Sequence, residues 1–250
     1  MEARRSPAVR WEVAALLSLL LSFSCSASRG PGQAGAPTAP PRPFLPGSLV
    51  AEAVVAAVGV FDQPDRPEPS RWLPSPQPSG APLVFLVEED RGDWLGVLLP
   101  VRPNGSRGWI RRADAALSVH RFRIVVELGA HRITVTDGDG IYHQESVGVG
   151  ARDTPTPGGL YYTTQLLRPT DAEGRPFPDG PYGPFAYALS GFSEVLYNFE
   201  GGEGVIGIHG TNEPDSLGGD TSYGCIRMSN DGITRLSGTL PVGVPVEIRA

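Results

Sequence analysis

The chain of 250 residues is long enough for one large domain or two modest ones. Its 32 glycines and 26 prolines exclude a mainly helical protein and predict short strands joined by many turns. The formal net charge of −6, without a basic run in the body of the chain, argues against a nucleic-acid-binding protein, and the absence of lysine excludes a lysine nucleophile.

Residues 1–28 predict an export signal. Arg4, Arg5 and Arg10 precede an apolar stretch at 13–23, and small residues follow it. The stretch is shorter than the about 20 residues that a membrane-spanning helix needs. An N-terminal anchor or a buried helix is the alternative interpretation.

One of the two cysteines, Cys25, belongs to this signal. Residues 21–25 resemble a bacterial lipoprotein box, so lipidation of Cys25 and plain secretion are both open. In either case we expect an exported protein of the cell envelope, attached to the membrane only through its signal or a lipid anchor. The body then keeps a single cysteine, Cys225, which excludes an internal disulfide and leaves a thiol that is either reactive or buried.

Residues 29–49 are rich in Gly, Pro and Ala and predict a disordered linker. Residues 50–115 predict a small β-barrel, because apolar runs at 83–87 and 93–101 precede an Asn104-Gly105 hairpin signal. This stretch is similar to bacterial SH3-like domains. Its tryptophans either form a ligand face or, as small cores more often show, pack inside: Trp72, Trp94 and Trp109.

Residues 117–250 predict a second, mostly β domain with one or two short helices. Apolar residues alternate along 122–128, as in a half-buried strand. Further strands are expected at 133–135, 141–149, 160–167, 205–208 and 244–248. Residues 231–236 predict a helix capped by Ser229 or Asn230.

Two short segments combine glycine with reactive side chains. The first contains His209 and Gly210 after an apolar strand, and the second contains Gly224 and Cys225, sixteen positions beyond the histidine. A thiol with a pKa of about 8.5 needs a neighbouring imidazole to form its thiolate at neutral pH. Backbone N–H groups at Tyr223, Gly224 and Cys225 could then form an oxyanion hole. Spacing alone leaves open a buried cysteine and a strand-end histidine without a catalytic role.

The paired motifs closely resemble the signature of the L,D-transpeptidase family of peptidoglycan enzymes. His209-Gly210-Thr211-Asn212 matches its first part, and Ser222, Gly224, Cys225 and Arg227 match its second. The resemblance extends more weakly over about 130 residues, including 154–158 and 189–194. The family usually has a histidine where this chain has Tyr223, and a phenol with a pKa of about 10 is a poor base at neutral pH.

The resemblance implies an L,D-transpeptidase-like β-sandwich with Cys225 as nucleophile, His209 as base and the Gly210 carbonyl orienting the imidazole. It implies substrate contacts, or loop stabilisation, for a further set of residues: Arg227, Ser222, Thr211, Asn212 and Tyr162. For Arg227 an ordinary ion pair is equally open. Tyr161 and Tyr182 are weaker candidates for the cleft.

The implied reaction joins two peptidoglycan stem peptides by a 3→3 cross-link, through a thioester on Cys225. Carbapenem-type β-lactams are the expected inhibitors, and neither a cofactor nor a metal is expected because no paired zinc-ligand motif occurs. Two alternatives remain. Water could replace the acceptor amine, giving an L,D-carboxypeptidase, or the protein could be a non-catalytic cell-wall-binding protein.

Overall fold

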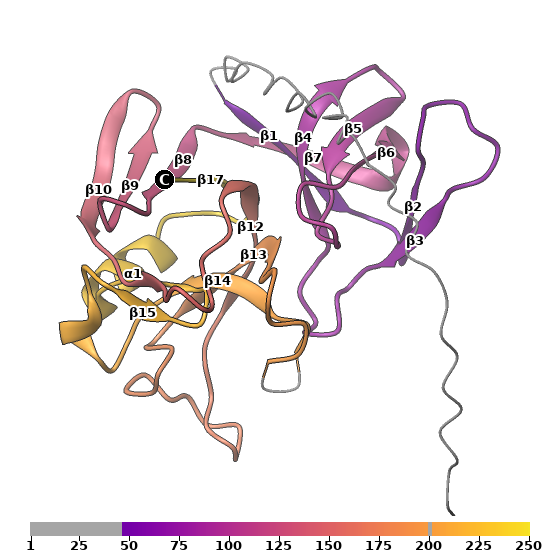
Figure 1. The fold of residues 1–250 in the computed structure, drawn as a ribbon. Coiled ribbons are helices and arrows are strands. Elements are labelled where there is room, and N and C mark those ends of the chain that lie inside the picture. The colour runs from indigo at the N-terminus through magenta and orange to yellow at the C-terminus, as the bar shows by residue number, and fades with distance from the viewer. Residues whose placement is uncertain (1–46, 200–201) are drawn as a thin grey trace, which may run out of the picture. The chain divides into compact units, whose positions relative to one another are not determined.

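The computed structural model describes residues 47–199 and 202–250. The export signal at 1–28, Cys25 and residues 29–46 of the predicted linker lie outside the described residues. All the described residues belong to one compact unit. Its strands form two main sheets, and the change from one to the other falls at residues 120–122 (Figure 1).

The first main sheet has five antiparallel strands in the order β6-β5-β4-β1-β7. Their bounds are β1 Ser48–Ala53, β4 Val84–Asp90, β5 Trp94–Leu98, β6 Arg107–Arg111 and β7 Ala115–His120. A small pair, β2 Ala57–Val60 and β3 Arg71–Pro74, and the 3₁₀ turn η1 Arg112–Asp114 complete this part. The strand predictions near 83–87 and 93–101 are confirmed, while the assignment as an SH3-like domain stays a prediction.

The three tryptophans of this part do not form one face. Trp94 is buried and donates its indole N–H to Asp65, whereas Trp72 is exposed. Trp109 lies under the guanidinium of Arg91. Trp94 is therefore a core residue, whereas Trp72 is exposed and Trp109 packs against an arginine.

The second main sheet has eight strands in the order β10-β9-β8-β17-β12-β13-β14-β16. Their bounds are β8 Phe122–Glu127, β9 Arg132–Asp137, β10 Gly140–Ser146, β12 Gly159–Leu167, β13 Ala186–Phe192, β14 Val205–His209, β16 Ile226–Arg227 and β17 Pro245–Arg249. β8 with β17 and β14 with β16 are parallel pairs, and the other neighbours are antiparallel. The mostly β fold class predicted from the sequence is confirmed.

Short elements complete the second part: the parallel pair β11 Val149–Gly150 and β15 Asp220–Ser222, the 3₁₀ turn η2 Pro214–Ser216 and the helix α1 Asn230–Ser237. The helix begins where the sequence predicts it, because the Ser229 hydroxyl accepts the N–H of Gly232. Its apolar face, Ile233 and Leu236, joins the core of the large sheet. The helix therefore closes one side of the sheet that carries β14 and β16 (Figure 1).

The two sheets meet over a shared apolar cluster. Val50, Val84 and Leu98 of the first sheet pack with Tyr162 of β12, whose hydroxyl donates to the Val84 carbonyl. Gly243 also belongs to this junction, since a Cβ there would lie 2.5 Å from a methyl of Val50. The first sheet thus packs directly against the larger one through these side chains.

Candidate active site

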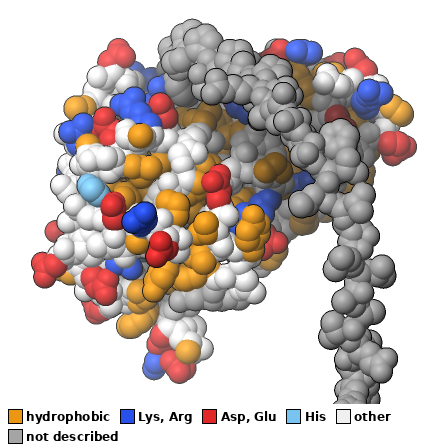
Figure 2. Space-filling model, viewed as in Figure 1, with side chains coloured by type: hydrophobic (Ala, Val, Ile, Leu, Met, Phe, Trp, Pro, Cys, Tyr) orange, Lys and Arg blue, Asp and Glu red, His pale blue; other side chains and the backbone are white. Residues whose placement is uncertain are grey.

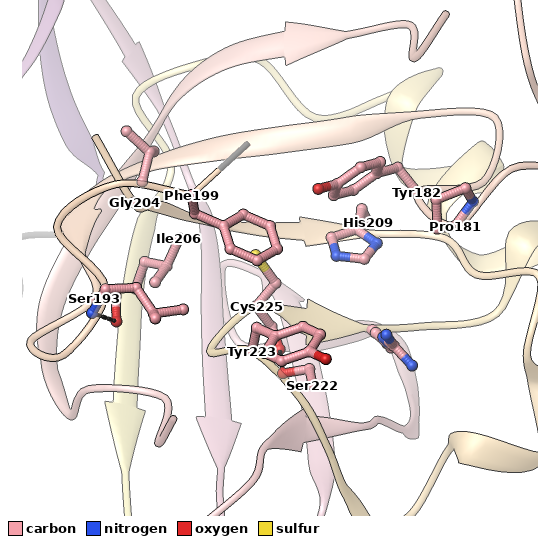
Figure 3. A pocket seen from close by; sticks show the side chains of 13 residues that line it. Pro181, Tyr182, Ser193, Phe199, Gly204, Ile206, His209, Ser222, Tyr223 and Cys225 are labelled. Carbon is pink, nitrogen blue, oxygen red and sulfur yellow. Dashed lines mark hydrogen bonds between the residues drawn. The ribbon is translucent and has the colours of Figure 1, made fainter. Parts of the chain in front are cut away.

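Strand pairing brings the two predicted catalytic residues together. β14 ends at His209, β16 lies parallel beside it, and the register places His209 opposite Arg227. Successive side chains alternate between faces, so Cys225, two residues before Arg227, turns to the same side as His209. Figure 3 shows both side chains entering one pocket from neighbouring segments.

The pocket has a cavity volume of about 130 Å³ and is mainly apolar. A cavity of this size holds only a few atoms of a larger molecule, and the rest of that molecule would extend over the surface. Figure 2 shows hydrophobic side chains gathered on this face of the molecule, over β13 and β14. The lining residues are Pro181, Tyr182, Ser193, Leu196, Phe199, Gly204, Val205, Ile206, His209, Ser222, Tyr223, Cys225 and Arg227.

His209 is held as a neutral imidazole. Only 4% of the residue is exposed, and its pKa is lowered from 6.5 to about 4 because burial disfavours the charged ring. The Gly210 carbonyl opposes this shift in part, and the positive charge of Arg227 adds to it. Nδ1 lies 2.6 Å from the Gly210 oxygen, and since a carbonyl only accepts, Nδ1 carries the proton. Nε2 therefore keeps the lone pair that a general base uses.

The orientation of this imidazole is fixed from a second side. The ring of Tyr182 packs edge-on against that of His209, with centroids 4.9 Å apart and an interplanar angle of 65°. Figure 3 shows the two rings next to each other at the rim of the pocket. A ring held by a short hydrogen bond and an aromatic contact loses little further freedom when it accepts a proton.

The turn after His209 is packed too closely for larger residues. A Cβ on Gly210 would lie 2.2 Å from the Asn230 side-chain oxygen, and one on Gly183 would lie 2.4 Å from the same atom. That oxygen accepts the N–H of Thr211 at 2.8 Å. Asn230, the first residue of α1, therefore anchors the backbone that carries the carbonyl bonded to His209.

The loop before Cys225 is braced by Ser222. The buried Ser222 hydroxyl donates to the Cys225 carbonyl at 2.6 Å and accepts the N–H of Gly224 at 3.1 Å. Gly224 has a φ of +116°, which side-chain-bearing residues rarely adopt. The oxyanion role of Gly224 stays a prediction, and in this structure its N–H is bonded to Ser222.

Arg227 and Tyr223 both line the pocket, and their contacts differ. Arg227, whose side chain is 14% exposed, donates to the Glu213 carboxylate at 2.7 Å, so the ion pair that the sequence left open is present. Tyr223 is exposed, and its ring lies 5.5 Å from that of Phe199 on the opposite wall. The residue that departs from the family pattern thus contacts an aromatic side chain across the rim.

Three other predicted substrate contacts lie elsewhere. The Tyr162 prediction is wrong, because this side chain is fully buried in the junction between the sheets. Thr211 is buried, and its hydroxyl accepts the N–H of Glu213. Asn212 is exposed outside the lining of the pocket, and Tyr161 is a core residue that donates to the Gly158 carbonyl. Of the tyrosines named as candidates for the cleft, Tyr182 lines it.

Sequence reasoning missed one wall of the pocket. Ser193, Leu196 and Phe199 follow β13 and line the cavity opposite Tyr223. The motif similarity at 189–194 includes the beginning of this wall but assigns no role to it.

In the ranges 47–199 and 202–250, no three His, Cys, Asp or Glu side chains gather as a metal site would require. Within the same ranges no helix has the length and apolarity to span a bilayer.

Comparison with known proteins agrees with this geometry. Residues 121–248 match the model of the YkuD L,D-transpeptidase catalytic domain. YkuD of Bacillus subtilis (strain 168), provisionally designated an L,D-transpeptidase, is 35% identical over 127 residues, which are 51% of this chain and 65% of that protein. YqjB of the same organism, with the same provisional designation, is 36% identical over 116 residues, 44% of this chain and 59% of its own length.

A solved L,D-transpeptidase from Mycobacterium tuberculosis H37Rv is 15% identical, with a TM-score of 0.43, over 79% of this chain and 80% of its own. The chain spans less than two thirds of the length of either Bacillus relative. The family model nevertheless covers the whole of the eight-stranded sheet apart from its last residue, and with it every residue of the pocket. The chain therefore belongs to the YkuD family of L,D-transpeptidase catalytic domains.

Proposed function

We propose that this protein is a cysteine acyltransferase that joins peptidoglycan stem peptides by 3→3 cross-links. The observation that carries the proposal is the shared pocket of Cys225 and His209, in which the imidazole is neutral and presents Nε2. A neutral imidazole beside a thiol is the arrangement that nucleophilic cysteine catalysis requires. Membership of the family supports the same reaction class.

In the first half-reaction, the Cys225 sulfur attacks the carbonyl carbon of the third residue of a donor stem. The thiol proton passes to Nε2 of His209 as the new C–S bond forms. The bond to the terminal D-Ala nitrogen then breaks, and the same proton moves to the departing amine. The product is a thioester on Cys225, and no oxidant, reductant or cofactor takes part.

In the second half-reaction, an amine on the third residue of a neighbouring stem attacks the thioester. His209 takes a proton from this amine and returns it to the departing sulfur, so that the free thiol is restored. The negative oxygen of each tetrahedral intermediate needs donors in place beforehand. We propose that backbone N–H groups of the 223–225 turn, which leads into the nucleophile, supply these donors.

Intact-protein mass spectrometry after incubation with a carbapenem tests the acyl-enzyme. The β-lactam ring opens when the thiol attacks its carbonyl, so one adduct of the full inhibitor mass is expected on wild type and none on Cys225→Ala. Ser237→Ala, which removes a solvent-exposed hydrogen bond at the end of α1, serves as the matched control and should be acylated like wild type. An unmodified wild type, or an adduct that persists in Cys225→Ala, would overturn the proposal.

Product analysis then separates transfer from hydrolysis. Purified protein is incubated with a tetrapeptide donor, with and without an acceptor stem that carries a free amine. A cross-linked dimer that needs the acceptor supports the transpeptidase, whereas a tripeptide alone in both reactions identifies an L,D-carboxypeptidase. Lack of turnover together with tight stem binding identifies a non-catalytic wall-binding protein.

We also propose that the protein acts in the cell envelope, where its substrate lies, after export directed by residues 1–28. The mass of the protein recovered from cell envelopes tests this. A chain that starts at Cys25 and carries lipid supports anchoring, and a cleaved chain without lipid supports secretion. An uncleaved chain confined to the cytoplasm would contradict export.

A further inference from the structure

One wall of the pocket is bonded to a residue of the other sheet. The wall, Ser193–Phe199 together with Gly202–Gly204, lies between β13 and β14. The bond comes from Arg102, in the connection between β5 and β6, about ninety positions earlier in the chain. Neither the motifs nor the proposed chemistry gives this arginine a role.

The Arg102 guanidinium donates to three backbone carbonyls of the wall. Nη1 lies 2.8 Å from the oxygen of Ser193, and Nη2 lies 2.8 Å from that of Glu203 and 3.3 Å from that of Leu196. These carbonyls come from both sides of the wall, so a single planar group joins its beginning to its end. Arginine suits this task because its five donors are fixed in one plane.

Aromatic contacts hold the same guanidinium in place. Its central carbon lies 4.8 Å from the ring centroid of Phe192 and 4.5 Å from that of Tyr197. Asn104 adds a second attachment, because its side-chain amide donates to the Phe192 carbonyl and accepts the Phe192 N–H, at 2.8 and 2.9 Å. The end of β13 is thus bonded to the first sheet immediately before the wall begins.

The wall is also tight at its other end. Gly204 has a φ of +70°, and a Cβ there would lie 2.0 Å from the Leu196 oxygen that Arg102 also bonds. The close contact between Gly204 and Leu196, together with the hydrogen bonds from Arg102 to the wall carbonyls, favours a single conformation of the wall. Without Arg102 these carbonyls would bond to water separately, and no group would then join the beginning of the wall to its end.

We propose that Arg102 is a positioning residue for the active site, which sets the wall of the pocket from the other sheet. This inference rests on the proposed acyl-transfer function. The wall contributes Leu196 and Phe199 to the cavity, and Phe199 contacts Tyr223 beside the nucleophile. Arg102 acts through these side chains on how a peptide or β-lactam is held, and it leaves the thiol and imidazole unchanged.

The test compares Arg102→Ala with wild type in two reactions at Cys225. Carbapenem acylation uses the wall, so its concentration for half-maximal rate should rise by about ten- to a hundredfold, the scale of loss from remote mispositioning. Alkylation by iodoacetamide, which is small and reports the thiol itself, should keep its rate within about twofold. Arg102→Lys retains the positive charge but has fewer fixed donors, so its half-maximal carbapenem concentration should lie between those of wild type and Arg102→Ala.

Arg107→Ala provides the matched control, because it removes an exposed arginine of β6 whose carboxylate partner, Glu88, belongs to the same sheet. It should behave like wild type in both reactions. Asn104→Ala, which loses two bonds to Phe192, should show a weaker form of the Arg102→Ala effect. Unchanged acylation in a folded Arg102→Ala protein, or an equal loss in both reactions, would overturn the proposal.

Hydrogen exchange keeps this test separate from the proposed function. Backbone amides in 193–199 should exchange faster in Arg102→Ala than in wild type or Arg107→Ala, while those of β12 should not. If wild type is never acylated, the acyl-transfer proposal fails and the exchange result alone decides whether Arg102 holds the wall. Unchanged exchange in 193–199 would reject the positioning role even if acylation is altered.

Discussion

Burial of His209 as a neutral ring should make the folded protein sensitive to acid. Its pKa is 6.5 in an unfolded chain and about 4 in the folded protein. Between these values the unfolded chain binds a proton that the folded protein does not, so the free energy of unfolding falls as the pH drops below about 6.5. At pH 4.5 this one side chain is expected to remove about 2 kcal/mol of the stability present at pH 7.

Urea unfolding of wild type and His209→Gln at pH 7 and pH 4.5 measures this contribution. Glutamine is polar but does not titrate, and other groups whose pKa is shifted by burial, such as His120, are the same in both proteins. Wild type should therefore lose about 2 kcal/mol more than the variant between the two pH values. Equal losses would refute the reasoning, because the imidazole would then be no harder to protonate in the folded protein than in the unfolded chain.

Three further predictions concern the same loops. The rate of carbapenem acylation should fall by less than about twofold from pH 7.5 to 5.5, because His209 stays neutral, and an acid limb centred near pH 6.5 would contradict this. Gly210→Ala should lower the free energy of unfolding by about 1–3 kcal/mol, because the new Cβ would clash with the Asn230 side-chain oxygen. In thermal unfolding, the double variant with Asn230→Ala should recover part of this loss. Ser222→Ala should lower the free energy of unfolding by about 1–3 kcal/mol and slow acylation, since the partly buried Cys225 carbonyl loses its donor. Unchanged urea unfolding would show that this hydrogen bond is dispensable.

The strands that the sequence predicts best are those with one buried face. Residues 122–127 alternate between core and partly exposed positions, and the pattern yields β8 within one residue of its bounds. β13 was missed because four consecutive residues from Leu189 to Phe192 are buried, so no alternation marks it as a strand. The helix α1 was found because its cap is a local interaction of Ser229 that sequence shows directly.

The same physics explains which site residues were found. Cys225, His209 and the Gly210 carbonyl lie in contiguous motifs, and their sequence neighbours carry the information. Tyr162 was misplaced because β12 is buried on both faces, with Tyr161 in the core of the large sheet and Tyr162 in the junction with the first one. Periodicity tells that two such neighbours face opposite sides but not which side is the cleft.

The strand β17 lies between β8 and β12 in the large sheet, although β16 and α1 both precede it in the sequence. Among the described strands, β17 alone pairs with both the half that contains β8, β9 and β10 and the half that contains β14 and β16, and its Val246 and Ile248 lie in the core of this sheet. The two pairings of β17 join residues far apart in the sequence, such as Val246 with Ile124 and Ile248 with Gly159, and contacts of this kind slow folding. Until β17 is in place these two halves of the sheet are not joined, so we expect the pocket of Cys225 and His209 to form only after this strand has docked.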